Sequence, residues 1–155
     1  MRRIRLFAKP RVDVATDEPD WIVERDVPVA MRDGTVLRVN VFRPRGDEPV
    51  PVIMSSHPYG KDAVPARSKS RRALNPQYRI MPQPARVAIS AWTGWEAPDP
   101  AFWVPRGYAV VNADARGGGT SEGEAHLFEP QEADDYEDLI AWAGTRAWST
   151  GKVGL

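Results

Sequence analysis

The sequence of 155 residues contains no cysteine and only two histidines. Without cysteine there is no disulfide framework, no thiolate nucleophile and no cysteine-based metal site. Two isolated histidines also argue against a zinc site. We therefore expect neither a metal nor a cofactor.

An excess of charge of either sign is also lacking, since 21 lysines and arginines balance 21 aspartates and glutamates. Broad attraction to nucleic acid or an anionic membrane needs a basic surface, so we expect neither partner. No apolar run approaches the length that crosses a bilayer. The apolar residues 6–8 are interrupted by Lys9 and Pro10 before a signal-peptide core forms. A soluble cytoplasmic protein is the expectation.

The first strands are predicted from alternation and turn chemistry. Residues 1–20 carry prolines and acidic residues without periodicity and predict a flexible amino-terminal arm. Residues 21–155 then predict a single partial domain. Within it, residues 22–29 and 36–42 are rich in β-branched side chains, and Asp33-Gly34 between them suits a tight turn. An antiparallel hairpin is therefore expected first.

Two further segments, residues 50–54 and 108–113, are almost continuously apolar. Unbroken apolar strands are typical of a parallel sheet that is covered on both faces by helices. The fold class is therefore α/β, with an antiparallel hairpin followed by a mostly parallel sheet.

The segment between these strands, residues 62–100, holds six prolines and several arginines, which exclude one long helix or a central strand. We predict a long Pro/Arg-rich loop. Aromatic residues are concentrated near the end of this loop and just after it; they are Trp92, Trp95, Phe102 and Trp103. We interpret them as residues that anchor the loop to the core, and the alternative is that they line a pocket.

A helix and a strand are predicted after residue 129. Pro130 suits the first turn of a helix, and the acidic residues Glu132, Asp134 and Asp135 lie where the helix dipole favours negative charge. Tyr136, Leu139, Ile140 and Ala143 form one apolar stripe. The turn at 149–151 then leads into a strand at Val153, which completes a strand-helix-strand crossover.

The segment Gly119-Thr120-Ser121-Glu122-Gly123 matches the nucleophile motif G-x-S-x-G. That motif needs a strand directly before the serine and a helix directly after it. Here the strand ends near Asp114 and no helix follows, so we interpret Ser121 as part of a surface turn. The glycines 117–119 also lack the lysine of a P-loop and the helix of a dinucleotide fingerprint, which argues against a phosphate site.

His57-Pro58-Tyr59-Gly60 follows the strand at 50–54. In α/β-hydrolases the loop in this position supplies half of the oxyanion hole, and a tyrosine hydroxyl is a suitable donor at neutral pH. Tyr59 is therefore a candidate oxyanion donor, and the competing interpretation is a tyrosine that only packs at a loop corner. His57 is a weak candidate for a general base because it precedes any catalytic serine.

Six segments in this order resemble the amino-terminal part of the X-Pro dipeptidyl-peptidase-like, cocaine-esterase-like (CocE/NonD) serine hydrolase family. They are Met31-Arg32-Asp33-Gly34-Thr35-Val36-Leu37, Pro58-Tyr59-Gly60-Lys61-Asp62, Pro105-Arg106-Gly107-Tyr108-Ala109-Val110-Val111, Asp114-Ala115-Arg116-Gly117, Ala133-Asp134-Asp135-Tyr136 and Trp148-Ser149-Thr150-Gly151-Lys152-Val153-Gly154. The resemblance runs from about Trp21 to the last residue.

The resemblance implies an α/β-hydrolase fold and hydrolysis of small esters, amides or X-Pro peptides by a Ser-Asp-His triad through an acyl-enzyme. By position, Tyr59 corresponds to the family's oxyanion tyrosine. The triad is expected beyond Leu155, so the chain is expected to stop before the nucleophile elbow and to be inactive alone. Asp114 and Arg116 match the family pattern, and we interpret them as ion-pair residues that stabilise turns. The alternative is a non-catalytic fragment that pairs with a complementing carboxy-terminal polypeptide.

Overall fold

The computed structural model describes residues 12–15, 19–65, 85–126 and 128–155. Its main element is a five-stranded mixed sheet with the strand order β2-β3-β6-β4-β7. The strands are β2 (Ile22–Ala30), β3 (Val36–Arg43), β4 (Val50–His57), β6 (Ala109–Asp114) and β7 (Ser149–Gly154). The expected α/β class is therefore confirmed.

The predicted hairpin is present as β2 and β3, which pair antiparallel. Gly34 has φ +86° in the connecting turn, a conformation that side chains other than glycine rarely adopt. β3 pairs antiparallel with β6, whereas β4 pairs parallel with both β6 and β7. The sheet thus changes from antiparallel to parallel at β6, as the sequence predicts.

The two faces of the sheet bury different side chains because neighbouring residues of a strand point to opposite sides. Along β6, Val111 belongs to the core under α3 (Pro130–Gly144), whereas Val110 packs with Phe42 and Val104 on the other face. Both valines have no exposed surface. This double burial explains why the strand reads as an unbroken apolar run.

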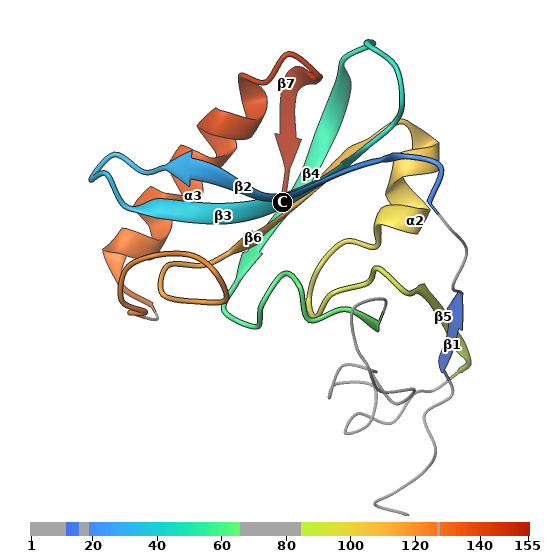
Figure 1. Cartoon of the computed structure of the whole chain (residues 1–155), viewed down its shortest axis with the longest axis horizontal. Helices are drawn as coiled ribbons and strands as arrows, with labels where there is room; N and C mark the ends of the chain where they lie inside the picture. Colours follow the sequence, from blue (N-terminus) through green and yellow to red (C-terminus); the bar gives the residue numbers. More distant parts are fainter. Residues whose placement is uncertain (1–11, 16–18, 66–84, 127) are drawn as a thin grey trace, which may run out of the picture.

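Helix α3 packs against β4 and β7 (Figure 1). Leu139 and Ala143 are fully buried, and Tyr136 and Ile140 pack against the same core. The opposite face is covered by α2 (Pro100–Trp103), by the 3-10 turn η2 (Val104–Arg106) and by aromatic rings.

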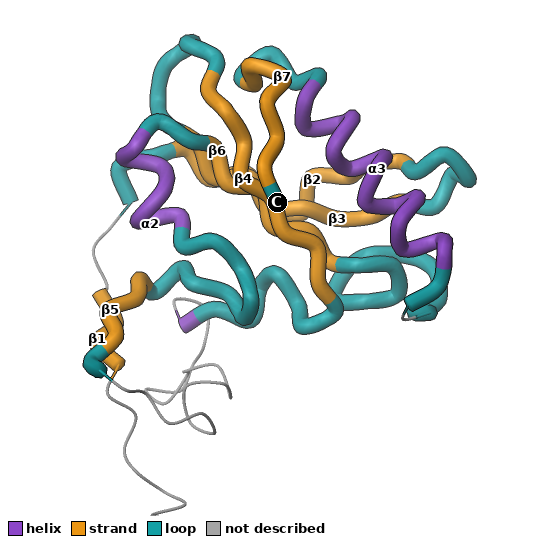
Figure 2. The backbone as a smooth tube through the Cα atoms, turned by 180° about the vertical axis from the view of Figure 1, so that it is seen from behind, coloured by secondary structure: helices purple, strands orange, loops and turns teal. Residues whose placement is uncertain are grey.

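Within residues 1–20, for which the sequence predicts a flexible arm, Val12–Ala15 form a strand, β1, that pairs parallel with β5 (Val87–Ser90). Val12 and Val14 alternate with Asp13, but a strand of four residues is too short for this alternation to be recognised in the sequence. The structure thus places one short strand within the segment predicted to be an arm. The β1-β5 sheet lies at the end of the molecule far from α3 (Figure 2).

In the predicted loop of residues 62–100, residues 66–84 lie outside the described part, and β5 is a short strand within the remainder. Of the aromatic residues near its end, Trp92 and Trp103 pack against the core that contains Phe42, so the prediction of core anchors holds for them. Phe102 is about half exposed. In the described ranges, no helix combines the length and apolar character needed to cross a membrane.

Candidate active site

The loop that carries Tyr59 starts where β4 ends. His57 closes β4 and is the register partner of Asp114, the last residue of the neighbouring strand β6. Because the two strands are parallel, their carboxyl ends meet at one edge of the sheet, where ligand sites of α/β folds form. The segments after β4 and β6 therefore lie side by side.

The Tyr59 ring stacks with two other rings. Its centroid lies 4.7 Å from that of Trp95 and 5.9 Å from that of His57, with interplanar angles of 17° and 26°. Its residue surface is 45% exposed. The two ring contacts thus restrict the Tyr59 ring while part of the residue stays open to solvent. Trp95 therefore contributes to this loop rather than to the core beneath α2.

His57 is buried, and within the described residues both of its ring nitrogens lack a hydrogen-bond partner. Burial lowers the pKa of His57, and the carboxylates of Asp114 and Glu96 offset this only in part. A neutral imidazole is therefore expected at pH 7, with one donor and one acceptor nitrogen.

The glycine-rich turn at residues 117–119 encloses a carboxylate of the same chain. Asp114 accepts hydrogen bonds from the Thr120 amide at 2.9 Å, from the Lys61 amide at 2.6 Å and from the Lys61 ammonium at 3.0 Å. A Cβ at Gly119 would overlap this carboxylate, and φ there is +50°. Glycine at position 119 thus allows the backbone of the turn to approach the Asp114 carboxylate closely. The turn binds a carboxylate of the chain itself, which argues against a phosphate site.

The Ser121 hydroxyl forms hydrogen bonds with the backbone of two strands. Its Oγ accepts the Arg38 amide at 2.9 Å and donates to the Asp114 carbonyl at 2.7 Å. The segment is a turn, not a strand-to-helix elbow. This arrangement supports the interpretation of Ser121 as a structural residue.

Asp114 and Arg116 both form ion pairs, as predicted, although not with each other. Arg116 binds Asp135 of α3 through two hydrogen bonds of 2.8 and 2.6 Å, and it also binds Asp33 of the β2-β3 turn at 2.9 Å. These contacts raise the pKa of Arg116, led by the bond to Asp135. Arg116 therefore joins the hairpin to the start of α3.

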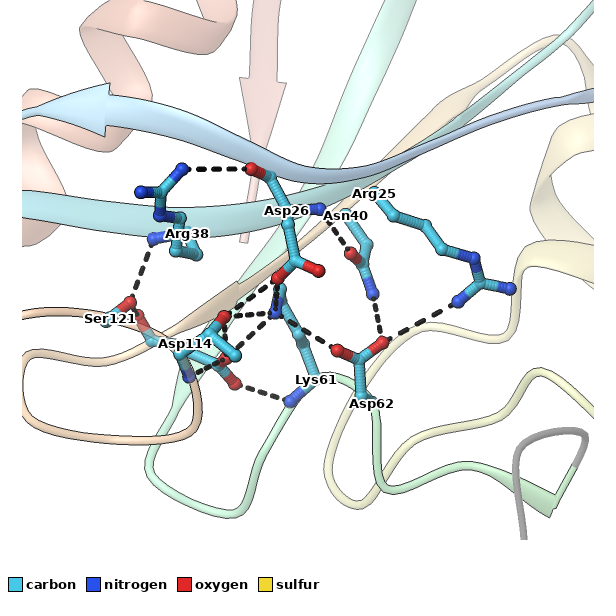
Figure 3. A network of polar contacts seen from close by, with 9 residues as sticks. Arg25, Asp26, Arg38, Asn40, Lys61, Asp62, Asp114 and Ser121 are labelled. Atoms are coloured by element: carbon cyan, nitrogen blue, oxygen red, sulfur yellow. Dashed lines mark hydrogen bonds and ion pairs between the residues drawn. The ribbon is translucent and has the colours of Figure 1, made fainter.

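Lys61 is the residue at this edge whose role the sequence analysis missed (Figure 3). Its ammonium lies 2.7 Å from Asp26, 3.0 Å from Asp114 and 3.3 Å from Asp62, and its side chain has no exposed surface. It also donates to the Thr120 hydroxyl at 2.8 Å. Burial lowers the pKa of Lys61, but hydrogen bonds to Asp26 and Asp114 outweigh it, so the net direction is upward.

A sequence signal for this network existed in β2. Glu24-Arg25-Asp26 places three charged residues in the middle of a strand, which interrupts the expected alternation. The register indeed shifts between Glu24 and Val27, and Asp26 has φ +52°. Such a bulge re-aims a side chain, here toward Lys61.

A hollow lies beside the Tyr59 loop, on the side of the α3 amino terminus. Its lining residues come from the ends of β4 and β6, from the following turn and from α3; they are Ser56, Pro58, Ala115, Arg116, Ala125, His126, Gln131, Glu132 and Asp135. Tyr59 is not among them. No group of side chains in the described ranges has the arrangement of a metal site.

Known proteins resemble most of this chain. The model of X-Pro dipeptidyl-peptidase (S15 family) matches residues 33–155. Cocaine esterase from Rhodococcus sp. (strain MB1 Bresler) is 36% identical over 136 residues, which are 88% of this chain and 19% of that protein.

Solved structures agree with these sequence matches. A CocE/NonD family hydrolase from Staphylococcus aureus is 41% identical with a TM-score of 0.70, over 86% of this chain and 22% of that chain. An α-amino acid ester hydrolase is 26% identical with a TM-score of 0.59, over 99% of this chain and 24% of that chain. The chain thus spans only about a fifth to a quarter of the length of these relatives.

Proposed function

Because this chain belongs to the X-Pro dipeptidyl-peptidase (S15) family of serine hydrolases, we propose that it forms the amino-terminal part of a catalytic α/β-hydrolase domain. The enzyme cleaves an ester or amide bond of a small molecule or peptide through an acyl-enzyme. In this proposal Tyr59 donates a hydrogen bond to the oxyanion, and the triad comes from sequence outside these 155 residues.

The position of Tyr59 is the observation that carries the proposal. Tyr59 lies in the loop after β4, which pairs parallel with β6 and β7. That loop supplies oxyanion donors in α/β-hydrolases. The ring stacks with the rings of His57 and Trp95 and its residue is 45% exposed, so a hydroxyl with a restricted position can reach a reacting group. A donor that is already oriented stabilises the developing charge without reorganisation.

The substrate class is supported by two of the relatives, which are a cocaine esterase and an α-amino acid ester hydrolase. Loss of one oxyanion donor costs about 3 kcal/mol of transition-state stabilisation, or roughly 10²- to 10³-fold in kcat. The contribution of Tyr59 is therefore measurable once a nucleophile is present.

The test places residues 21–155 in the Staphylococcus aureus CocE/NonD family hydrolase, in exchange for the corresponding segment. Turnover of p-nitrophenyl esters is then compared between this hybrid enzyme and its Tyr59→Phe variant. We expect kcat to fall by about 10²- to 10³-fold with KM nearly unchanged. The control is Tyr108→Phe, since Tyr108 contacts the Trp103 ring on the α2 side of the sheet. Equal kcat for Tyr59→Phe and the control would overturn the donor role.

A second test uses the 155-residue chain itself with a fluorophosphonate probe. We expect no labelling of Ser121, because its hydroxyl is bound to the Arg38 amide and the Asp114 carbonyl. Labelling of Ser121 accompanied by ester turnover would contradict the assignment of the nucleophile to another segment.

A further inference from the structure

Lys61 lies two residues after Tyr59, and its ammonium is fully buried. Three carboxylates and one hydroxyl surround it, contributed by β2, by β6 and by the segments that follow β4 and β6. A buried ion pair of this kind commonly stabilises a fold no better than apolar side chains of similar volume. Stability alone is therefore a weak reason for a lysine at this position.

The segment Pro58-Tyr59-Gly60 is held at both ends by the end of β6. Before it, the His57 carbonyl accepts the Ala115 amide at 3.1 Å. After it, the Lys61 amide donates to the Asp114 carboxylate at 2.6 Å, and the Lys61 ammonium binds the same carboxylate. The path of the backbone through Tyr59 is thus set by two fixed points, of which Lys61 is one.

One neighbouring segment, the bulge of β2, adopts an unfavourable conformation beside this lysine. Asp26 has a positive φ in the β2 bulge, and Gly119 has a positive φ where the turn closes on Asp114. Positive φ in a residue such as aspartate costs free energy and concentrates at functional sites. The Asn40 side chain links two of the residues that bind Lys61, since it accepts a hydrogen bond from the Asp26 amide and donates one to the Asp62 carboxylate.

We infer that Lys61 is a positioning residue for the hydrolysis reaction. Its ammonium is bound by Asp26 and Asp114 (Figure 3). These bonds fix the short segment after β4, and the Tyr59 hydroxyl is thereby aimed at the oxyanion. Lys61 itself does not touch the substrate. This inference rests on the proposed role of Tyr59 as a donor.

The experiment is a double-mutant cycle in the hybrid enzyme described above, with Lys61→Met, Tyr59→Phe and both changes together. A misplacement of about 1 Å costs up to about 10²-fold in rate, so we expect Lys61→Met to lower kcat by about 10- to 100-fold with KM nearly unchanged. In the Tyr59→Phe background the same change should alter kcat by less than about twofold, because no donor is left to misplace. The control is Arg43→Met, which removes the Arg43–Glu24 pair between β2 and β3.

The outcomes separate the two proposals. If Tyr59→Phe leaves kcat unchanged, the donor role of Tyr59 fails, and with it the premise of this inference. Suppose that Tyr59→Phe lowers kcat, and that Lys61→Met lowers kcat by the same factor in the Tyr59→Phe enzyme as in the enzyme that retains Tyr59. Lys61 then does not act through Tyr59, and the inference is overturned. A loss caused by Arg43→Met equal to that of Lys61→Met would also overturn it.

Thr120→Val provides the same cycle without a change of charge, in case Lys61→Met prevents folding. It removes the hydroxyl that accepts from Lys61 and donates to Asp26. We expect a smaller fall in kcat that again vanishes in the Tyr59→Phe background. In the 155-residue chain, the ring resonances of Tyr59 should shift in Thr120→Val while those of Tyr108 stay in place. Unchanged Tyr59 resonances would contradict the inference.

Discussion

Burial, rather than the number of contacts, should decide what an ion pair contributes to this fold, and two arginines allow a direct test. Arg116 pairs with Asp135 and Asp33, and its side chain is 13% exposed. Arg32 pairs with three carboxylates of α3, namely Asp134, Glu137 and Asp138, but its side chain is 44% exposed. The perturbation is Arg116→Met compared with Arg32→Met.

The expected magnitude follows from the geometry. Asp135 is only 7% exposed and receives two hydrogen bonds from Arg116. Removing one partner of a buried pair costs about 3–5 kcal/mol, because the other charge stays buried without compensation. For a chain of this length, 1 kcal/mol corresponds to about 2–4 °C in Tm, so Arg116→Met should lower Tm by roughly 6–20 °C. Exposed pairs are screened by water, and Arg32→Met should lower Tm far less.

The assay is thermal and urea unfolding of the 155-residue chain, followed by circular dichroism. Arg116→Lys should lower Tm less than Arg116→Met, since lysine keeps the charge but cannot form the same two hydrogen bonds to Asp135. Arg116→Met with Asp135→Leu should recover part of the loss, because no buried charge is left unpaired. Equal destabilisation by Arg116→Met and Arg32→Met would refute the reasoning.

Three further predictions concern the turns around the candidate site. Ser121→Ala should lower the free energy of unfolding by about 1–3 kcal/mol, measured in urea, because two backbone groups lose their partner; no change would contradict a structural role. Gly119→Ala should destabilise the fold more than Gly46→Ala, since only the Cβ at Gly119 overlaps a carboxylate. The hydrogen bond from Arg116, then that from the Thr35 amide, lowers the pKa of Asp33 from 3.8 to about 2. The stability from this lowered pKa is therefore complete above pH 4 and is lost as pH falls through about 2. A carboxyl NMR titration of Asp33 should have its midpoint near 2 and move toward 3.8 in Arg116→Met.

Much of the fold could be predicted because its signals are local. The apolar run in β6 requires burial on both faces, and the helical stripe at Leu139 and Ala143 requires one buried face. Asp33-Gly34 specifies a turn through the left-handed φ of glycine. The short strands β1 and β5 could not be predicted, because four residues carry too little periodicity to be distinguished from loop.

Part of the candidate site could also be predicted. Tyr59 was selected because it follows a buried strand, and its role stays a prediction. Asp114 and Arg116 were predicted to form ion pairs, and both do. Their partners could not be deduced, since Asp114 pairs with a lysine that lies 53 residues earlier in the chain.

The sequence by itself determined the order and type of the main strands and of α3, because hydrophobic periodicity and turn residues act over a few neighbouring positions. Only the tertiary structure decided that the glycine turn encloses Asp114, that Asp26 bulges out of β2, and that Lys61 unites them. The physical reason is that the energy of a buried charge depends on which distant groups surround it, and the pairing of strands far apart in the chain brings those groups together.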